Sequence, residues 1–296
     1  MNPEIENLNR QFGIASVLNF ADVNGLPVIE IATSASTARI AVQGGQVLEW
    51  QPAGQQSVIW VSRAAVYQVG KGVRGGVPVC WPWFGAGEPG KPAHGFVRTR
   101  MWQVRATGQD ADGTFVRLGI KDDADTRAIW DYAFDLELLV NVGARLNMEL
   151  ITHNTGNATL RITDALHTYF RIGDIGHTEV LGLELAIYQD KVSGQDRQVQ
   201  TGPVAFAGET DRIYLDTQAD CLIKDERFGR SIRVAKKGSD TTVVWNPWTE
   251  KEKTFADMSA GEYRDMLCVE TCNAATDVIV LQPGEKHSLL AELSVE

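Results

Sequence analysis

His167 is the first of two residues whose type and setting suit proton transfer. It lies in the segment RITDALHTYFRI, where strand alternation puts it on one face with Tyr169, Arg161 and Arg171, opposite a mostly apolar face. If that face lines a cleft, the histidine would make a proton donor, because imidazole titrates near neutral pH. The alternative is a solvated or hydrogen-bonded structural histidine, which is the commoner role of any single histidine.

Glu270 is the second residue, and its neighbours predict burial. It lies in DMLCVETCNAA, with Cys268 and Cys272 on its own face of a predicted strand and further burial-prone residues on the other face. Acidic side chains are almost never fully buried without a partner, and burying an unpaired one costs on the order of several kcal/mol. Such surroundings raise a carboxyl pKa into the range of a general base, and a structural salt bridge is the alternative.

Residues 74–102 read RGGVPVCWPWFGAGEPGKPAHGFVRTRMW, a run dense in Gly, Pro and aromatic residues. Gly and Pro at this frequency exclude a helix or a long strand, whereas the aromatic residues favour an ordered segment. We predict a shaped loop over a cavity that holds Arg74, His94 and Arg98. Arginine suits bidentate contact with phosphate, although corner turns and ordinary surface charges would explain the same residues.

Other candidate positions carry weaker signals. Asp211, in GETDRIYLDT, could face the same site or simply begin a strand as a turn residue. We interpret Trp245-Asn246-Pro247-Trp248 as a packed turn. His94, His167 and a carboxylate could together bind a metal, but no spacing supports such a site, and the sequence has no nucleotide-binding loop. The remaining histidines are expected to be peripheral: His153, His177 and His287.

Composition and charge limit the kinds of binding partner and the cellular compartment that we expect for this protein. The 296 residues carry a formal net charge of -10 and a pI near 5.1. We therefore expect no nucleic-acid or anionic-membrane partner, since both require a basic field. The N-terminal residues do not resemble a signal peptide, no apolar run is long enough to span a bilayer, and the four cysteines form no C-x-x-C pair. These features predict a cytoplasmic protein with reduced thiols.

The hydrophobic pattern predicts an all-β fold with a few short helices. Alternation is clearest over residues 132–172, which we divide into three long strands with turns between them. Further strands are expected on both sides, and short helices at 3–13, 126–130 and 255–264. Many strands without βα alternation, and no linker or repeat, indicate one large antiparallel β-sandwich domain over residues 1–296.

Several motifs of the chain resemble the aldose-1-epimerase (galactose mutarotase) superfamily, and within it the hexose-6-phosphate mutarotase branch. The carriers are RGGVPVCWPWFG, HGFVR, LHTYF, the Asp of ETDRIY and the Glu of CVETCNA, and the resemblance covers about residues 15–295. It implies a galactose mutarotase-like sandwich with His167 as general acid and Glu270 as general base. The positions matched to phosphate and sugar binding are Arg74 and Arg98 for the phosphate, and His94 and Asp211 for the sugar.

The resemblance implies that the α and β anomers of a hexose 6-phosphate, glucose 6-phosphate being the expected substrate, interconvert by acid–base ring opening and reclosure. Neither a metal nor a nucleotide cofactor is implied, the partner is a small sugar phosphate, and we favour a monomer. One departure is Ala93, where some members place a substrate-touching Gln. Two alternatives stay open: a mutarotase of unphosphorylated aldoses, and a carbohydrate-binding module without turnover.

Overall fold

Alternation of mainly apolar with mainly polar residues builds the longest hairpin of the protein. The structure, a computed structural model, describes residues 2–296. Strands β8 (Phe134–Val142) and β9 (Leu146–Asn154) bury every second side chain and pair in register from Phe134↔Asn154 to Val142↔Leu146. Because side chains alternate between the two faces of a strand, this pattern gives one face to a core and one to solvent.

This hairpin lies in a nine-stranded antiparallel sheet. In order across the sheet, its strands are β16 (Val204–Ala205), β13 (Thr178–Leu181), β18 (Cys221–Asp225), β19 (Arg230–Lys237), β23 (Lys286–Val295), β9, β8, β7 (Gly113–Lys121) and β6 (Gln103–Asp110). The sequence Asp112-Gly113 is typical of a hairpin turn, and the turn that joins β6 to β7 lies at residues 111–112, directly before Gly113.

A second, eight-stranded sheet carries the segments singled out in the sequence. In order, its strands are β15 (Gln195–Val199), β14 (Ile187–Asp190), β17 (Thr210–Leu215), β20 (Thr241–Asn246), β21 (Met266–Asn273), β11 (Asp164–Leu166) and β5 (Val79–Cys80), with β12 (Tyr169–Arg171) also paired to β21. A four-stranded sheet holds β1 (Leu18–Val23), β2 (Leu26–Ala32), β3 (Ser36–Ala41) and β4 (Val47–Pro52), and a short pair holds β10 (Leu160–Ile162) and β22 (Ile279–Leu281).

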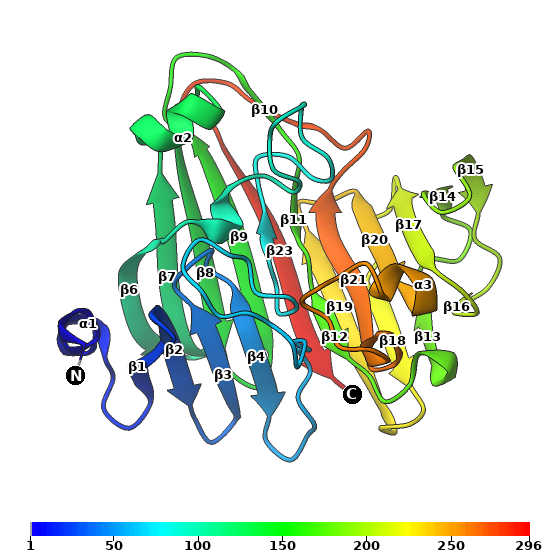
Figure 1. The fold of residues 1–296 in the computed structure, drawn as a ribbon, viewed down its shortest axis with the longest axis horizontal. Helices are drawn as coiled ribbons and strands as arrows, with labels where there is room; N and C mark the ends of the chain where they lie inside the picture. Colours follow the sequence, from blue (N-terminus) through cyan, green and yellow to red (C-terminus); the bar gives the residue numbers. More distant parts are fainter. Residues whose placement is uncertain (1) are drawn as a thin grey trace.

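The sheets are layered on one another (Figure 1). Strand β3 contacts β8, and β21 contacts β23, so both the four-stranded and the eight-stranded sheets meet the nine-stranded one. One cluster of buried side chains joins them, with Ile31, Leu138 and Leu267 each from a different sheet. The predicted all-β antiparallel sandwich with few helices is confirmed.

The helices are short, and one prediction is wrong. Helix α1 (Pro3–Phe12) and helix α2 (Ala124–Ile129) lie where expected, and Asp123 begins α2 with a capping box. The helix predicted over 255–264 is absent from the described chain. Instead α3 (Trp248–Glu252) precedes that segment, and only a 3₁₀ turn (Glu262–Arg264) follows Gly261, whose φ of 86° is left-handed and incompatible with a continuing helix.

The third long strand predicted within 132–172 is also wrong, because it is broken into β10, β11 and β12. The break at Thr163 changes the partner: β10 pairs with β22, whereas β11 and β12 pair with β21. At this break the Thr163 hydroxyl oxygen accepts a hydrogen bond from the backbone N–H of Phe84 at 2.8 Å. The Thr163 N–H also donates to the Pro82 carbonyl at 3.1 Å, so the loop backbone takes the place of a neighbouring strand here.

Residues 74–102 form the predicted shaped loop, with only the two-residue β5 and a 3₁₀ turn (Val97–Thr99) as regular structure. Gly95 shows why glycine is needed here: its φ is 72°, and a Cβ would collide with the Trp81 carbonyl across a backbone bridge.

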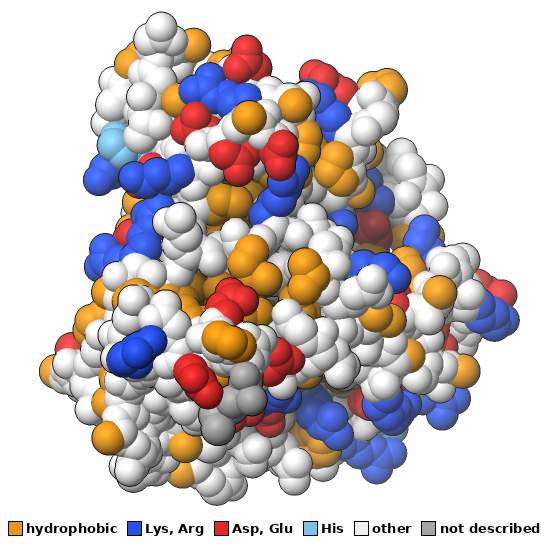
Figure 2. Space-filling view, turned by 60° about the vertical axis from the view of Figure 1, so that its left-hand side comes forward, with side chains coloured by type: hydrophobic (Ala, Val, Ile, Leu, Met, Phe, Trp, Pro, Cys, Tyr) orange, Lys and Arg blue, Asp and Glu red, His pale blue; other side chains and the backbone are white. Residues whose placement is uncertain are grey.

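On the surface, Figure 2 shows Lys and Arg interspersed with Asp and Glu on the face viewed. Among residues 2–296, no helix is long and apolar enough to cross a membrane.

Candidate active site

A cavity of about 840 Å³ lies on the face of the eight-stranded sheet that is turned away from the shared core. Val244 and Val269 point into the core, whereas the neighbouring Val243 and Glu270 line the cavity, as strand alternation requires. All six residues predicted from the sequence line it: Arg74, His94, Arg98, His167, Asp211 and Glu270.

Strand register brings His167 and Glu270 together. Strands β11 and β12 pair with β21 in one continuous register, from Leu166↔Thr271 to Tyr169↔Cys268, so His167 in the gap falls opposite Glu270. Its Nε2 lies 3.3 Å from Glu270 Oε1. The His167 N–H donates to the Pro78 carbonyl, which ties this gap to the glycine-rich loop instead of to a neighbouring strand.

Burial governs the charge of this pair. The Glu270 side chain is 1% exposed and that of His167 is 12% exposed. Burial, followed by the charge of Asp211, raises the pKa of Glu270 well above its usual value. Burial, followed by His94, Arg98 and Arg74, lowers the pKa of His167. Across residues 2–296, Glu270 Oε2 and His167 Nδ1 have no hydrogen-bond partner. The raised pKa of Glu270 and the lowered pKa of His167 favour a neutral Glu270 carboxyl group beside a neutral His167 imidazole.

His94 adds a neutral hydrogen-bond donor. Its backbone has a left-handed φ of 61°, and its Nδ1 accepts a hydrogen bond from the Gly85 N–H at 3.3 Å. Burial, together with Arg98 and Arg74, lowers the pKa of His94 to about 4. The neutral ring therefore carries its proton on Nε2, where it can donate. Its centroid lies 5.5 Å from that of His167 in an edge-on arrangement.

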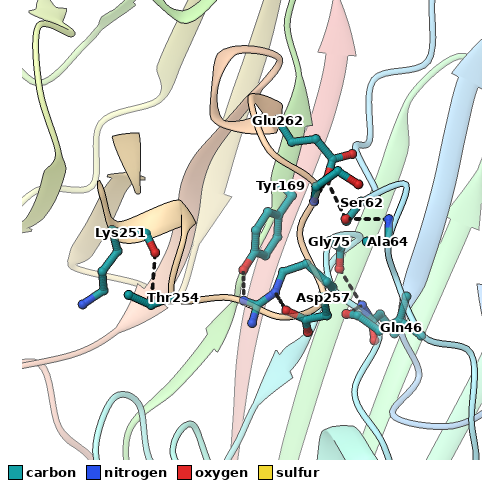
Figure 3. Close-up of polar contacts among 12 residues, drawn as sticks. Gln46, Ser62, Ala64, Gly75, Tyr169, Lys251, Thr254, Asp257 and Glu262 are labelled. Carbon is teal, nitrogen blue, oxygen red and sulfur yellow. Dashed lines mark hydrogen bonds and ion pairs between the residues drawn. The ribbon is translucent and has the colours of Figure 1, made fainter. Parts of the chain in front are cut away.

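Arg74 is held from three sides. Its Nε donates to Asp257 Oδ1 at 3.0 Å and its Nη1 to the Tyr169 hydroxyl at 3.4 Å, while its guanidinium carbon lies 4.5 Å from the centroid of Phe255. Figure 3 shows Tyr169 from β12 and Asp257 from the segment after α3 approaching the same guanidinium. Such contacts limit the rotamers of a long side chain and fix its direction.

Arg98 lies across the same cavity wall on the 3₁₀ turn of the loop. Its Nη2 donates to the Ala93 carbonyl at 3.0 Å. Ala93 therefore contributes its backbone carbonyl to this wall. Both Arg74 and Arg98 also line an adjoining hollow of about 150 Å³, which Gln46 and Thr99 complete.

Asp211 reaches the cavity from β17, where it pairs with Trp245 of β20. Burial raises its pKa, and the nearby Lys191 opposes that rise. Asp211 is thus a true strand residue of the cavity wall and not only a turn residue that begins a strand. A carboxylate at this point can accept hydrogen bonds from sugar hydroxyls.

A cavity with a facing carboxylate and imidazole, two arginines and an aromatic wall has the chemistry expected of a sugar-transforming site. The family model described as Aldose 1-epimerase matches residues 27–294. The chain belongs to the aldose 1-epimerase family.

This aldose 1-epimerase has relatives over nearly its whole length. It is 36% identical over 276 residues to an Escherichia coli K12 protein named "Putative glucose-6-phosphate 1-epimerase", covering 93% of this chain and 92% of that protein. A protein of the same name from Cenchrus ciliaris is 33% identical over 84% of this chain and 78% of its own. A solved structure described as a putative mutarotase from Salmonella typhimurium superposes with a TM-score of 0.90 at 32% identity, covering 96% and 95% of the two chains.

Sequence reasoning missed part of the cavity wall of this family member. Trp245 lines the cavity, and its ring centroid lies 6.3 Å from that of His167, so interpreting it as part of a packed turn was wrong. Asn246 ends β20 and Trp248 begins α3, where it packs on Tyr263, so only Pro247 lies between the two elements. Alternation in the sequence puts Val243 and Trp245 on one face of a strand, but only the pairing of Val243 with Glu270 shows that this face lines the cavity.

Two polar residues of the wall also went unnoticed. Gln189 and Lys191 line the cavity from the end of β14 and the turn after it. In the sequence they look like ordinary surface residues, and only the packing of β14 beside β17 brings them to the site. The predicted peripheral histidines lie elsewhere: His153, His177 and His287 are absent from the cavity lining.

Proposed function

We propose that this enzyme interconverts the α and β anomers of a hexose 6-phosphate, with glucose 6-phosphate as the expected substrate. Membership of the aldose 1-epimerase family makes it a mutarotase, and the phosphorylated substrate is the part proposed here. The observation that carries the proposal is one cavity lined at once by the His167–Glu270 pair and by Arg74 and Arg98. Two guanidinium groups in an otherwise acidic protein supply a local site for a phosphate dianion.

Ring opening needs two proton transfers. Glu270 as carboxylate takes the proton of the C1 hydroxyl, and protonated His167 gives a proton to the ring oxygen. The C1–O bond to the ring breaks with its electron pair on that oxygen, and C1 becomes an aldehyde. Rotation about C1–C2 and reclosure on the other face of the carbonyl return both protons and give the other anomer. A positioned acid or base contributes roughly 10²–10⁴-fold.

The pair holds one proton throughout, on His167 before opening and on Glu270 after it. In the empty cavity, burial favours the second arrangement, which is the one that matches the open-chain sugar. Arg98 and Arg74 add to this bias by disfavouring the imidazolium. A phosphate bound to both arginines would cancel their charge, weaken this bias and so favour protonation of His167 when substrate is bound.

Anomer exchange measured by saturation-transfer NMR tests the substrate. We expect the protein to accelerate exchange of glucose 6-phosphate well beyond that of glucose or galactose. Changing both Arg74 and Arg98 to Ala should abolish that preference. Arg100→Ala is the matched control, because Arg100 lies two residues from Arg98, pairs with Asp125 and does not line the cavity. A preference that survives the double change would refute the phosphate assignment.

Two further results would redirect the proposal. Acceleration of free sugars alone would keep the acid–base pair and assign the enzyme to unphosphorylated aldoses. Binding of sugars without any acceleration would identify a carbohydrate-binding module. The four cysteines are free and buried, which fits a reducing compartment, and we propose a cytoplasmic location on that basis.

A further inference from the structure

Cys268 is a buried thiol that the proposed reaction does not use, yet it faces the reacting pair. It lies two residues from Glu270 on β21, hence on the same face of the sheet. It pairs with both Tyr169 of β12 and Trp245 of β20, so it lies beneath two rings of the cavity wall. One ligand atom each from His167, Cys268 and Glu270 lies within 4.8 Å of the other two.

The spacing of these atoms approaches that of a tetrahedral zinc site. Zn–N and Zn–O bonds of about 2.0–2.2 Å place two ligand atoms about 3.3–3.5 Å apart. His167 Nε2 and Glu270 Oε1 are already 3.3 Å apart. With a Zn–S bond of about 2.3 Å, the separations to sulfur would be about 3.6 Å, so each of them, at most 4.8 Å here, has to shorten by up to about 1.2 Å.

We propose that His167, Cys268 and Glu270 form an inhibitory binding site for Zn²⁺. Imidazole, thiolate and carboxylate together select a borderline ion such as Zn²⁺ over Mg²⁺ or Ca²⁺, which prefer oxygen ligands alone. Three protein ligands leave a fourth position open to water. The carboxylate oxygen Oε2 of Glu270, which has no partner among residues 2–296, offers a second point of contact on the same ligand.

The charges of the three ligands favour binding of Zn²⁺ at this site. A dipositive ion with one carboxylate and one thiolate has no net charge, whereas each anion alone is costly to bury. Asp211 on the same wall adds attraction, and Arg74 and Arg98 oppose it. Zinc binding must also release the protons that the Cys268 thiol and the Glu270 carboxyl group carry in the empty cavity, so it strengthens as pH rises.

Occupancy would stop the reaction whatever sugar the cavity takes. The ion engages the Nε2 lone pair of His167 and an oxygen of Glu270, the two atoms through which protons would move. The site is therefore separate from the question of the phosphate and can be tested without settling it.

The experiment follows Zn²⁺ inhibition of anomer exchange and, independently, Co²⁺ binding through its thiolate charge-transfer absorption in the ultraviolet. We expect inhibition that EDTA reverses, and weaker inhibition when sugar is in excess. Cys268→Ser should weaken inhibition at least about tenfold relative to its own metal-free rate, and should lose the Co²⁺ band. Cys272→Ser is the matched control, since Cys272 is equally buried on the same face of β21, and it should behave as the unmodified protein.

Three outcomes would overturn the site. The first is a rate insensitive to Zn²⁺, and the second is equal inhibition of the Cys268→Ser and Cys272→Ser proteins. The third is a Co²⁺ complex of the unmodified protein without thiolate absorption. This last measurement needs no variant, so it decides the matter even if Cys268→Ser fails to fold.

Discussion

Glu270 is the residue whose setting is hardest to explain by stability. Its carboxyl group is 1% exposed, and its closest polar neighbour, the His167 imidazole, is itself made less basic by burial. A structural carboxylate at this depth would be expected to have better partners. Glu262 shows the contrast: it is as deeply buried, but it accepts hydrogen bonds from the Ser62 hydroxyl and the Arg63 N–H at 2.7 Å each.

Replacing the base tests this distinction. Glu270→Gln keeps the size of the side chain and removes both the charge and the proton acceptor. We expect the catalysed exchange rate to fall about 10²–10⁴-fold while stability is kept or increased, because no unpaired acid remains buried. NMR exchange and urea unfolding measure the two quantities. Glu149→Gln on β9, outside the cavity, serves as control, and an unchanged rate in Glu270→Gln would remove Glu270 from the reaction.

At the scale of elements, the segment between α3 and the 3₁₀ turn at Glu262 positions Arg74. Glu262 holds this segment, because its carboxylate accepts the Ser259 N–H at 2.7 Å as well as the Ser62 hydroxyl, a contact visible in Figure 3. Asp257 from this segment both orients Arg74 and reduces the net positive charge offered to a phosphate.

Two variants of Asp257 separate orientation from charge. Asp257→Asn keeps an acceptor for Arg74 Nε and removes the negative charge, so KM for glucose 6-phosphate should fall. Asp257→Ala removes the acceptor too, so KM should rise. The Arg74–Asp257 ion pair is partly exposed, and such a pair contributes up to about 1 kcal/mol. The change in KM should therefore be at most about fivefold in either variant. Steady-state exchange measurements give KM, and equal shifts in both variants would contradict the positioning role.

Strand β11 carries a second unusual acid, Asp164, on the face opposite His167. It is fully buried, and within the described chain neither carboxyl oxygen has a hydrogen-bond partner. Burial, with the charge of Asp277 adding to it, raises the pKa of Asp164 to about 8. The folded protein therefore holds a proton that the unfolded chain releases near its usual pKa of about 4.

Stability should consequently decrease as pH rises from about 4 to about 8, by up to about 1.4 kcal/mol per pH unit from this residue. Asp164→Asn removes that loss, so its free energy of unfolding should exceed that of the unmodified protein at pH 8 and approach it near pH 4. Urea unfolding at the two pH values tests this. Asp112→Asn, at an exposed turn, should change neither value, and a pH-independent effect of Asp164→Asn would disprove the raised pKa.

At the scale of the whole molecule, we propose that the chain is one domain. The core cluster joins the four-stranded sheet to both large sheets, and the cavity draws residues from strands far apart in sequence. Removing any one sheet would expose the core face of the others.

Unfolding should therefore be a single transition, coincident by tryptophan fluorescence and circular dichroism. Glucose 6-phosphate at 100 times its dissociation constant should add about 2.7 kcal/mol, because it binds only the folded state. Galactose at the same concentration should add less. Two separated transitions, only one of them moved by the sugar phosphate, would indicate two domains.

The sequence by itself determined the features of the fold that depend on residues close together in the chain. The alternation of β8 and β9, the turn next to Gly113 and the short helix α2 are local features, and the sequence predicts all three. The sequence also names six residues that line the cavity, partly from their type and setting and partly from the motifs that resemble the aldose 1-epimerase superfamily.

Only the tertiary structure decided which strands pair and therefore what meets in the cavity. The interruption of the third strand depends on a loop residue, Phe84, that bonds to Thr163 from 79 residues away. Trp245 and Lys191 reach the cavity because β20 and β14 flank β17, which no local pattern encodes. The 3.3 Å approach of His167 to Glu270 has the same origin, since two residues 103 positions apart meet only through the register of β11 and β12 on β21.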